Sequence, residues 1–125
     1  MPDTNSSGSG GTVQLTLPWP VSTNRLYRAV GGRSILSEAY RRWKLEAGWA
    51  LAAQHPKRVF GPVAVTVELC APDKRRRDAD NSGKAILDLL VAHQIIEDDS
   101  SKFVREFTAK WVDSGDPCTV IVRAA

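Results

Sequence analysis

Cysteine and histidine are scarce in this chain, and the shortage excludes several classes of protein. The two cysteines, Cys70 and Cys118, lack zinc-ligand spacing, so we expect two free thiols, as in a reducing cytoplasm. The sequence has no Ser-His-Asp or Cys-His arrangement, which excludes hydrolases of those kinds. It also has no glycine-rich phosphate loop, so no small-molecule cofactor is expected.

Long apolar runs are missing as well, and this bears on where the protein works. The longest apolar stretch, around residues 85–92, is interrupted by Asp88 and falls well short of the ~20 residues needed to span a bilayer. The N-terminus shows no basic region followed by an apolar core, so no secretion signal is visible. We therefore expect a cytoplasmic protein without a membrane partner.

Hydrophobic periodicity indicates one small domain, which suits a chain of 125 residues. Residues 1–11 offer little to bury and are predicted to be a flexible tail, which leaves residues 12–125 as the folded domain. Alternating apolar residues predict four strands, at residues 12–17, 63–70, 103–111 and 118–123. Helical spacing predicts two helices, at residues 38–54 after an N-cap at Ser37, and at residues 81–92. The fold class is therefore α/β (α+β), with a mixed four-stranded sheet and two helices.

The segments between these elements carry signals of their own. Residues 21–37 are predicted to form a long basic loop with a small hairpin around Gly31-Gly32, and residues 113–117 a hairpin loop that joins the last two strands. Leu45 and Trp49 lie off the main apolar stripe of the first helix and offer a second apolar contact. The buried face of that helix should consist of Tyr40, Trp43, Ala47, Ala50 and Leu51.

Positive charge is concentrated in two clusters, although the formal net charge is only +3. One cluster lies between residues 24 and 44, and the other is the run of basic residues 74–77. Because cations attract phosphates, the clusters favour a nucleic-acid partner, with solvated surface charge as the alternative. The predicted DNA-binding residues are Arg25, Arg28, Arg33, Lys74, Arg75, Arg76 and Arg77.

Carboxylates follow the second basic cluster directly. Asp78 and Asp80 are two residues apart, so in an extended chain both can face one point. Lys84 comes four residues after Asp80, on the same side of the new helix as Asp88. Hard carboxylate oxygens suit Mg²⁺, or Mn²⁺ as a substitute, and Lys84 could neutralise charge on a phosphate. The pattern predicts a metal-dependent site for nucleic acid, with helix capping by Asp80 as the alternative.

A second acidic pair, Asp98-Asp99, follows the second helix and is either part of a turn or part of the same site. The helix should be roughly 18 Å long. Residues 93–98 reach about 20 Å when nearly straight, so a return to Asp80 is tight. Three routes remain open: an almost fully extended return, an early end of the helix, or acids from two subunits.

Several of these motifs together resemble the RusA family of Holliday-junction resolvases, which phages and prophages often carry. The matching pieces are Leu17-Pro18-Trp19-Pro20, the loop from Ser22 to Arg28, the segment from Pro72 to Lys84, and Asp98-Asp99. The resemblance covers nearly all of residues 12–125. It departs mildly in the loop, where Thr23 and Leu26 stand in place of the family's frequent asparagine and tyrosine.

The resemblance implies a homodimeric, Mg²⁺-dependent crossover junction endodeoxyribonuclease. Such an enzyme resolves four-way (Holliday) DNA junctions by paired symmetric nicks in recombination and repair. The resemblance gives catalytic roles to Asp78, Asp80, Asp99 and Lys84, and metal ligation to Asp78, Asp80, Asp98 and Asp99. Its partners are branched DNA and a second copy of the chain. Two alternatives stay open, a non-catalytic DNA-binding protein and a metal nuclease that acts on other branched DNA.

Overall fold

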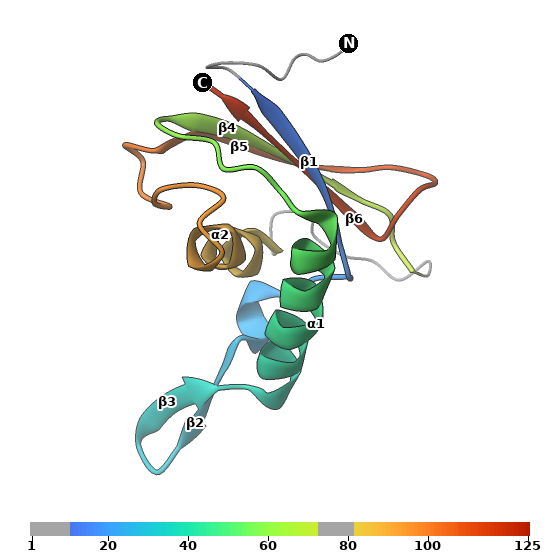
Figure 1. Ribbon diagram of the computed structural model, residues 1–125. Coiled ribbons are helices and arrows are strands. Elements are labelled where there is room, and N and C mark those ends of the chain that lie inside the picture. Colours follow the sequence, from blue (N-terminus) through green and yellow to red (C-terminus); the bar gives the residue numbers. More distant parts are fainter. Residues whose placement is uncertain (1–10, 73–81) are drawn as a thin grey trace.

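The computed structural model describes residues 11–72 and 82–125 (Figure 1). Residues 1–10 of the predicted tail lie outside the described residues, and so do residues 73–81, with the second basic cluster, Asp78 and Asp80. The elements follow one another as β1 (Thr12–Leu17), η1 (Thr23–Arg25), β2 (Tyr27–Val30), β3 (Arg33–Leu36), α1 (Glu38–Gln54), β4 (Val63–Leu69), α2 (Gly83–Ala92), β5 (Val104–Trp111) and β6 (Cys118–Ala124). The predicted strands and helices are present, and the predicted α+β domain is confirmed.

A mixed four-stranded sheet forms one layer, and both helices lie on the same side of it (Figure 1). The strand order is β1-β6-β4-β5, in which β4 runs parallel to β5 and antiparallel to β6. Alternate side chains of a strand point to the same face of a sheet. Those of β4 on the helix side are at most 2 % exposed and belong to Val63, Val65, Val67 and Leu69. The core therefore lies between the sheet and the two helices.

The loop at residues 113–117 is not the predicted hairpin loop, because β5 and β6 do not pair. β4 lies between them, so the loop passes across the end of β4. There the N–H of Val112 donates to the carbonyl of Leu69 at 2.9 Å, and that of Cys70 to the carbonyl of Pro117 at 3.0 Å. The crossover through α2 makes β4 and β5 parallel neighbours, which leaves the other edge of β4 for β6. Turn residues specify that the chain reverses, but not which strand it then joins.

Helix α1 begins and ends where the sequence predicts. The Ser37 hydroxyl accepts the N–H of Tyr40 at 3.1 Å, which is the predicted N-cap. Ala50 is only half-buried, and the off-stripe residues Leu45 and Trp49 are 60 % and 72 % exposed. The rest of the predicted buried face is confirmed, at Tyr40, Trp43, Ala47 and Leu51.

Residues 27–36 form a two-stranded hairpin, which we call the arm, and it extends away from the rest of the domain (Figure 1). Its turn uses Gly31 and Gly32 at positive φ (57° and 76°), as tight hairpin turns of this kind require. The predicted small hairpin is therefore confirmed. Leu26, immediately before the arm, is fully buried, and its carbonyl accepts the N–H of Ser37 at 2.9 Å. The two ends of the arm thus join the domain at one point.

Both cysteines are free, as predicted. Cys118 is buried, and this burial raises the pKa of its thiol to about 12, whereas Cys70 is half-buried. Among the helices of residues 11–72 and 82–125, none combines the length and the apolar character that crossing a membrane requires.

Candidate active site

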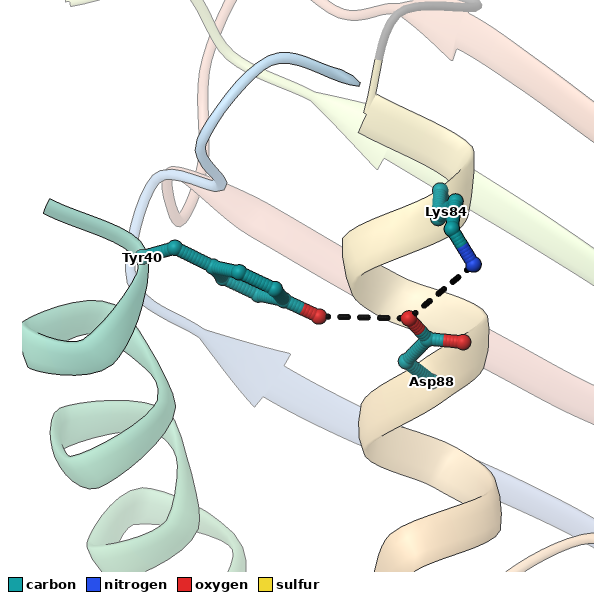
Figure 2. A network of polar contacts seen from close by, with 3 residues as sticks. All are labelled: Tyr40, Lys84 and Asp88. Atoms are coloured by element: carbon teal, nitrogen blue, oxygen red, sulfur yellow. Dashed lines mark hydrogen bonds and ion pairs between the residues drawn. The ribbon is translucent and has the colours of Figure 1, made fainter. Parts of the chain in front are cut away.

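Helices α1 and α2 meet in a polar network of three side chains, Tyr40, Lys84 and Asp88 (Figure 2). Asp88 lies one turn after Lys84 on α2, so both project from the same face of the helix. Nζ of Lys84 donates to Oδ2 of Asp88 at 3.3 Å, and the Tyr40 hydroxyl donates to the same oxygen at 3.2 Å. The side chains of Lys84 and Asp88 are 48 % and 30 % exposed, whereas Tyr40 is 2 % exposed. The network therefore leads from the core to the surface.

Lys84 is held in its charged form. The hydrogen bond to Asp88 and the charge of that carboxylate raise the pKa of Lys84, with smaller contributions from Tyr27 and Asp99. The charge of Asp99, on the loop after α2, therefore also acts on Lys84, more weakly than that of Asp88. As an ammonium, Lys84 can donate a hydrogen bond or offset negative charge, and it cannot serve as a general base near neutral pH.

The loop after α2 returns by a tight reversal and not by an extended segment. The helix ends at Ala92, as predicted, and Gln94 adopts a left-handed conformation with φ of 60°. Ile95 and Ile96 follow and are only 2 % and 1 % exposed, and the N–H of Ile95 donates to the carbonyl of Leu90 at 2.9 Å. Burial of the two isoleucines against the core therefore directs the loop that carries Asp98 and Asp99.

Asp98 stabilises the turn on which Asp99 lies. A hydrogen bond from the Ser100 hydroxyl lowers the pKa of Asp98, and the backbone N–H groups of Asp99 and Ser100 add to the effect. Asp98 is therefore ionised near neutral pH, with its carboxylate bonded locally. Asp99 itself is exposed. Hydrogen bonds within the turn thus involve Asp98, while the charge of Asp99 adds weakly to that of Asp88 at Lys84.

The pair Asp98-Asp99 has the donor chemistry for a hard divalent cation, because carboxylate oxygens are the ligands that Mg²⁺ prefers. Across residues 11–72 and 82–125, however, no three histidine, cysteine or acidic side chains gather into a group that could hold a metal. The other two predicted ligands, Asp78 and Asp80, lie outside the described residues. A complete metal site would therefore need further acids, either from residues 73–81 or from a second copy of the chain.

The predicted DNA-binding arginines of the described residues lie on η1 and the arm. Arg25 ends η1, Arg28 lies on β2 and Arg33 on β3, and all three are exposed. The remaining predicted DNA-binding residues, Lys74 to Arg77, lie outside the described residues. Exposed arginines on a projecting arm are well placed to reach a polyanion.

The sequence places Tyr40 on the buried face of α1 and does not predict that its hydroxyl belongs to the site. A buried tyrosine usually gives its hydroxyl a hydrogen-bond partner, and this requirement was the available signal. Tyr27, at the base of the arm, was missed as well: its ring packs edge-on against that of Tyr40, with centroids 6.4 Å apart. The Lys44 ammonium lies 5.2 Å from the centre of the Tyr40 ring. Tyr40 is therefore the point where the arm, α1 and α2 meet.

Replacing Tyr40 with phenylalanine should change how stability depends on pH. Burial and the neighbouring Asp88 carboxylate raise the pKa of Tyr40 from 10.0 to about 12. A phenol whose pKa rises on folding stabilises the protein fully below pH 10, and this contribution is lost as the pH rises towards 12. In urea titrations at several pH values, the free energy of unfolding should fall more steeply between pH 10 and 12 in the parent than in Tyr40→Phe. If the free energy of unfolding depended on pH in the same way in both proteins, the raised pKa of Tyr40 would be contradicted.

Fold and site together define a small α+β domain whose described surface carries a charged lysine, carboxylates and exposed arginines. Comparison with known families then gives a specific answer, because the sequence model described as endodeoxyribonuclease RusA matches residues 18–123. The chain belongs to the RusA family, whose members are enzymes that hydrolyse phosphodiester bonds in DNA. The predicted family and enzyme class are confirmed.

Individual relatives agree with this assignment. Proteins named crossover junction endodeoxyribonuclease RusA from Shigella sonnei (strain Ss046) and Escherichia coli (strain K12) are each 39 % identical to the chain over 90 residues. A protein of the same name from Enterobacteria phage 82 shows the same identity over the same length. In each case the alignment covers 63 % of this chain and 67 % of the relative.

Proposed function

We propose that the chain is a Mg²⁺-dependent, structure-selective endodeoxyribonuclease that resolves four-way DNA junctions by paired symmetric nicks in recombination and repair. The observation that carries the proposal is the half-exposed Lys84 ammonium, 3.3 Å from Oδ2 of Asp88 on α2, in a chain that belongs to the RusA family. Carboxylates beside a fixed ammonium suit phosphodiester hydrolysis, because the cation can offset charge that grows on the phosphoryl oxygens. The choice of substrate follows the names of the relatives.

Asp78, Asp80 and Asp99, with Asp98 beside them, would hold the divalent cation, and Mn²⁺ should substitute for Mg²⁺. When bound, such an ion polarises the scissile phosphate and lowers the pKa of the attacking water. The chain's own contribution is then electrostatic. Lys84 presents its ammonium to the phosphate, and the turn at Asp98 holds Asp99 in place.

Two copies of the chain would act together. A four-way junction has approximate two-fold symmetry, and two opposed nicks are needed to separate it into duplexes. A C₂ homodimer supplies two equivalent sites, whereas a monomer would have to rebind between cuts. Arginines of the arm would contact phosphates, which position a protein on DNA without reading its sequence.

The test is cleavage of a synthetic four-way junction, with a linear duplex and a flap as matched substrates. Each is incubated with the protein in Mg²⁺, in Mn²⁺ and in EDTA, and the strands are resolved on a denaturing gel. We expect paired nicks at symmetric positions of the junction with either metal and no cutting in EDTA. Tight binding without cutting would support the non-catalytic alternative, and equal rates on all three substrates would contradict selectivity for junctions.

Removing the arginines of the arm should weaken junction binding and reduce its dependence on salt. Each phosphate contact on duplex DNA contributes about 0.9 to the slope of log affinity against log salt, so Arg28→Ala with Arg33→Ala should make the slope shallower by about 2. Arg123→Ala is the control, since Arg123 lies on the sheet, 3.6 Å from Glu106. Fluorescence anisotropy at several salt concentrations measures both quantities. An unchanged slope would remove the arm from the DNA-binding surface.

A further inference from the structure

The contacts of Tyr40, Asp88 and Lys84 between α1 and α2 indicate what the first two residues do for the third. We propose that Asp88 and Tyr40 are positioning residues, which hold the Lys84 ammonium in one place for the phosphate of the substrate. This inference rests on the proposed function and deepens it. Neither residue is assigned to contact the DNA or the metal, so each would act only through Lys84.

Within residues 11–72 and 82–125, the anchor of Lys84 is Asp88. One oxygen of Asp88 accepts both the Lys84 ammonium and the Tyr40 hydroxyl, at 3.3 and 3.2 Å (Figure 2). A half-exposed lysine has a long flexible side chain and would otherwise sample many rotamers. An isolated lysine–carboxylate pair one turn apart on a helix surface holds its partners weakly. The second hydrogen bond, from the opposite helix, fixes the carboxylate and with it the position of the ammonium.

Tyr40 is a rigid support for this anchor. Its ring is buried and stacks on that of Trp43, with centroids 6.4 Å apart and an interplanar angle of 26°. The indole N–H of Trp43 in turn donates to the carbonyl of Pro18 at 3.1 Å. Packing and this hydrogen bond leave the Tyr40 hydroxyl little freedom. The Tyr40 hydroxyl, which has one orientation, therefore determines through Asp88 where the partly exposed Lys84 ammonium lies.

The charge of Asp88 argues for a positioning role and against simple surface pairing. A carboxylate near a phosphate-binding site repels the substrate, so on electrostatic grounds alone an acid is unfavourable here. This electrostatic cost is offset when Asp88 holds the Lys84 ammonium in the position that the reaction needs. The pair Lys110–Glu68 offers a comparison: it spans 3.5 Å with side chains 55 % and 30 % exposed. Glu68 lies on the face of β4 opposite the helix-facing residues, so the pair is matched in exposure but remote from the site.

The experiment combines single-turnover cleavage of the four-way junction with a direct readout of Lys84. Asp88→Asn keeps the size of the side chain and removes its charge, and Tyr40→Phe removes only the hydroxyl. We expect Asp88→Asn to cut about tenfold more slowly with junction affinity unchanged or higher, and Tyr40→Phe to have a smaller effect in the same direction. Asp88→Glu should recover part of the rate, and Glu68→Gln should match the parent.

A double-mutant cycle separates positioning from a structural effect. In a Lys84→Ala background, Asp88→Asn should cause no further loss, because its whole effect passes through the lysine. ¹⁵N relaxation of lysine side chains should show a restrained Lys84 ammonium in the parent and a mobile one in Asp88→Asn. Circular dichroism and thermal unfolding confirm that each variant is folded.

The outcomes are distinct. Additive losses in the cycle, or a Lys84 ammonium that is equally mobile in the parent and in Asp88→Asn, would overturn the positioning role. A parent protein that cuts no junction would instead overturn the proposed function. In that case the relaxation data still decide whether Asp88 and Tyr40 hold the lysine.

Discussion

Replacing Asp99 with asparagine is expected to slow junction cleavage by about a hundredfold or more while leaving binding intact or tighter. The amide keeps the shape of the side chain and removes the negative charge that a divalent cation needs. The charge of Asp99 also acts on Lys84, so its loss disturbs the electrostatic balance of the site on the protein side. Tighter binding follows because one carboxylate fewer faces the phosphates of the DNA.

Single-turnover rates in Mg²⁺, together with dissociation constants measured in EDTA, separate the two effects. Asp116→Asn is the matched control: this acid lies in the exposed loop between β5 and β6. Asp116→Asn should leave the cleavage rate and the affinity for the junction near those of the parent. Asp80→Asn should reproduce the loss seen at Asp99 if the two acids serve one metal. An Asp99→Asn variant that cuts as fast as the parent would exclude this carboxylate from catalysis.

Replacing Leu26 with alanine should cause a large loss of stability for a loop position, about 2–5 kcal/mol of unfolding free energy. Leu26 is 0 % exposed and belongs to the main core, although it lies in a basic loop between η1 and β2. Truncation leaves a cavity where the arm joins the domain. The backbone bond from Ser37 to the Leu26 carbonyl is unaffected by the change, so the loss should come from packing.

The measurement is urea unfolding near neutral pH, with Leu45→Ala as the matched control. Leu45 is 60 % exposed on α1, so the same truncation there should change the unfolding free energy by less than about 0.5 kcal/mol. If the arm contacts DNA, Leu26→Ala should also weaken junction binding, because the arm loses its fixed orientation. Equal effects of the two substitutions would show that Leu26 does not anchor the arm.

Much of the fold could be read from local patterns, because the signals concerned act within a few residues. The N-cap at Ser37 and the apolar spacing of α1 give both ends of that helix. Alternation along residues 63–69 gives β4, and Gly31-Gly32 gives the turn of the arm. Each of these features depends on propensities and hydrogen bonds between near neighbours in the chain.

Strand order could not be read in the same way. The turn residues at 113–117 correctly mark a reversal, yet β6 pairs with β4 and β1 and not with β5. Pairing depends on which strand edges remain free after the crossover through α2, and this is a property of the whole sheet. The same holds for Leu26, whose basic loop gives no local sign that its side chain belongs to the core.

For the site, the chain's residues alone specify the chemistry: clustered acids, one lysine at helical spacing and basic runs, which together indicate a metal-dependent enzyme for nucleic acid. Folding determines which of these residues become neighbours in space. Two buried isoleucines direct the loop that carries Asp99, and Tyr40 meets Asp88 because two helices pack on one face of the sheet. Periodicity tells which side of a helix is buried, but the partner across the interface follows only from long-range packing.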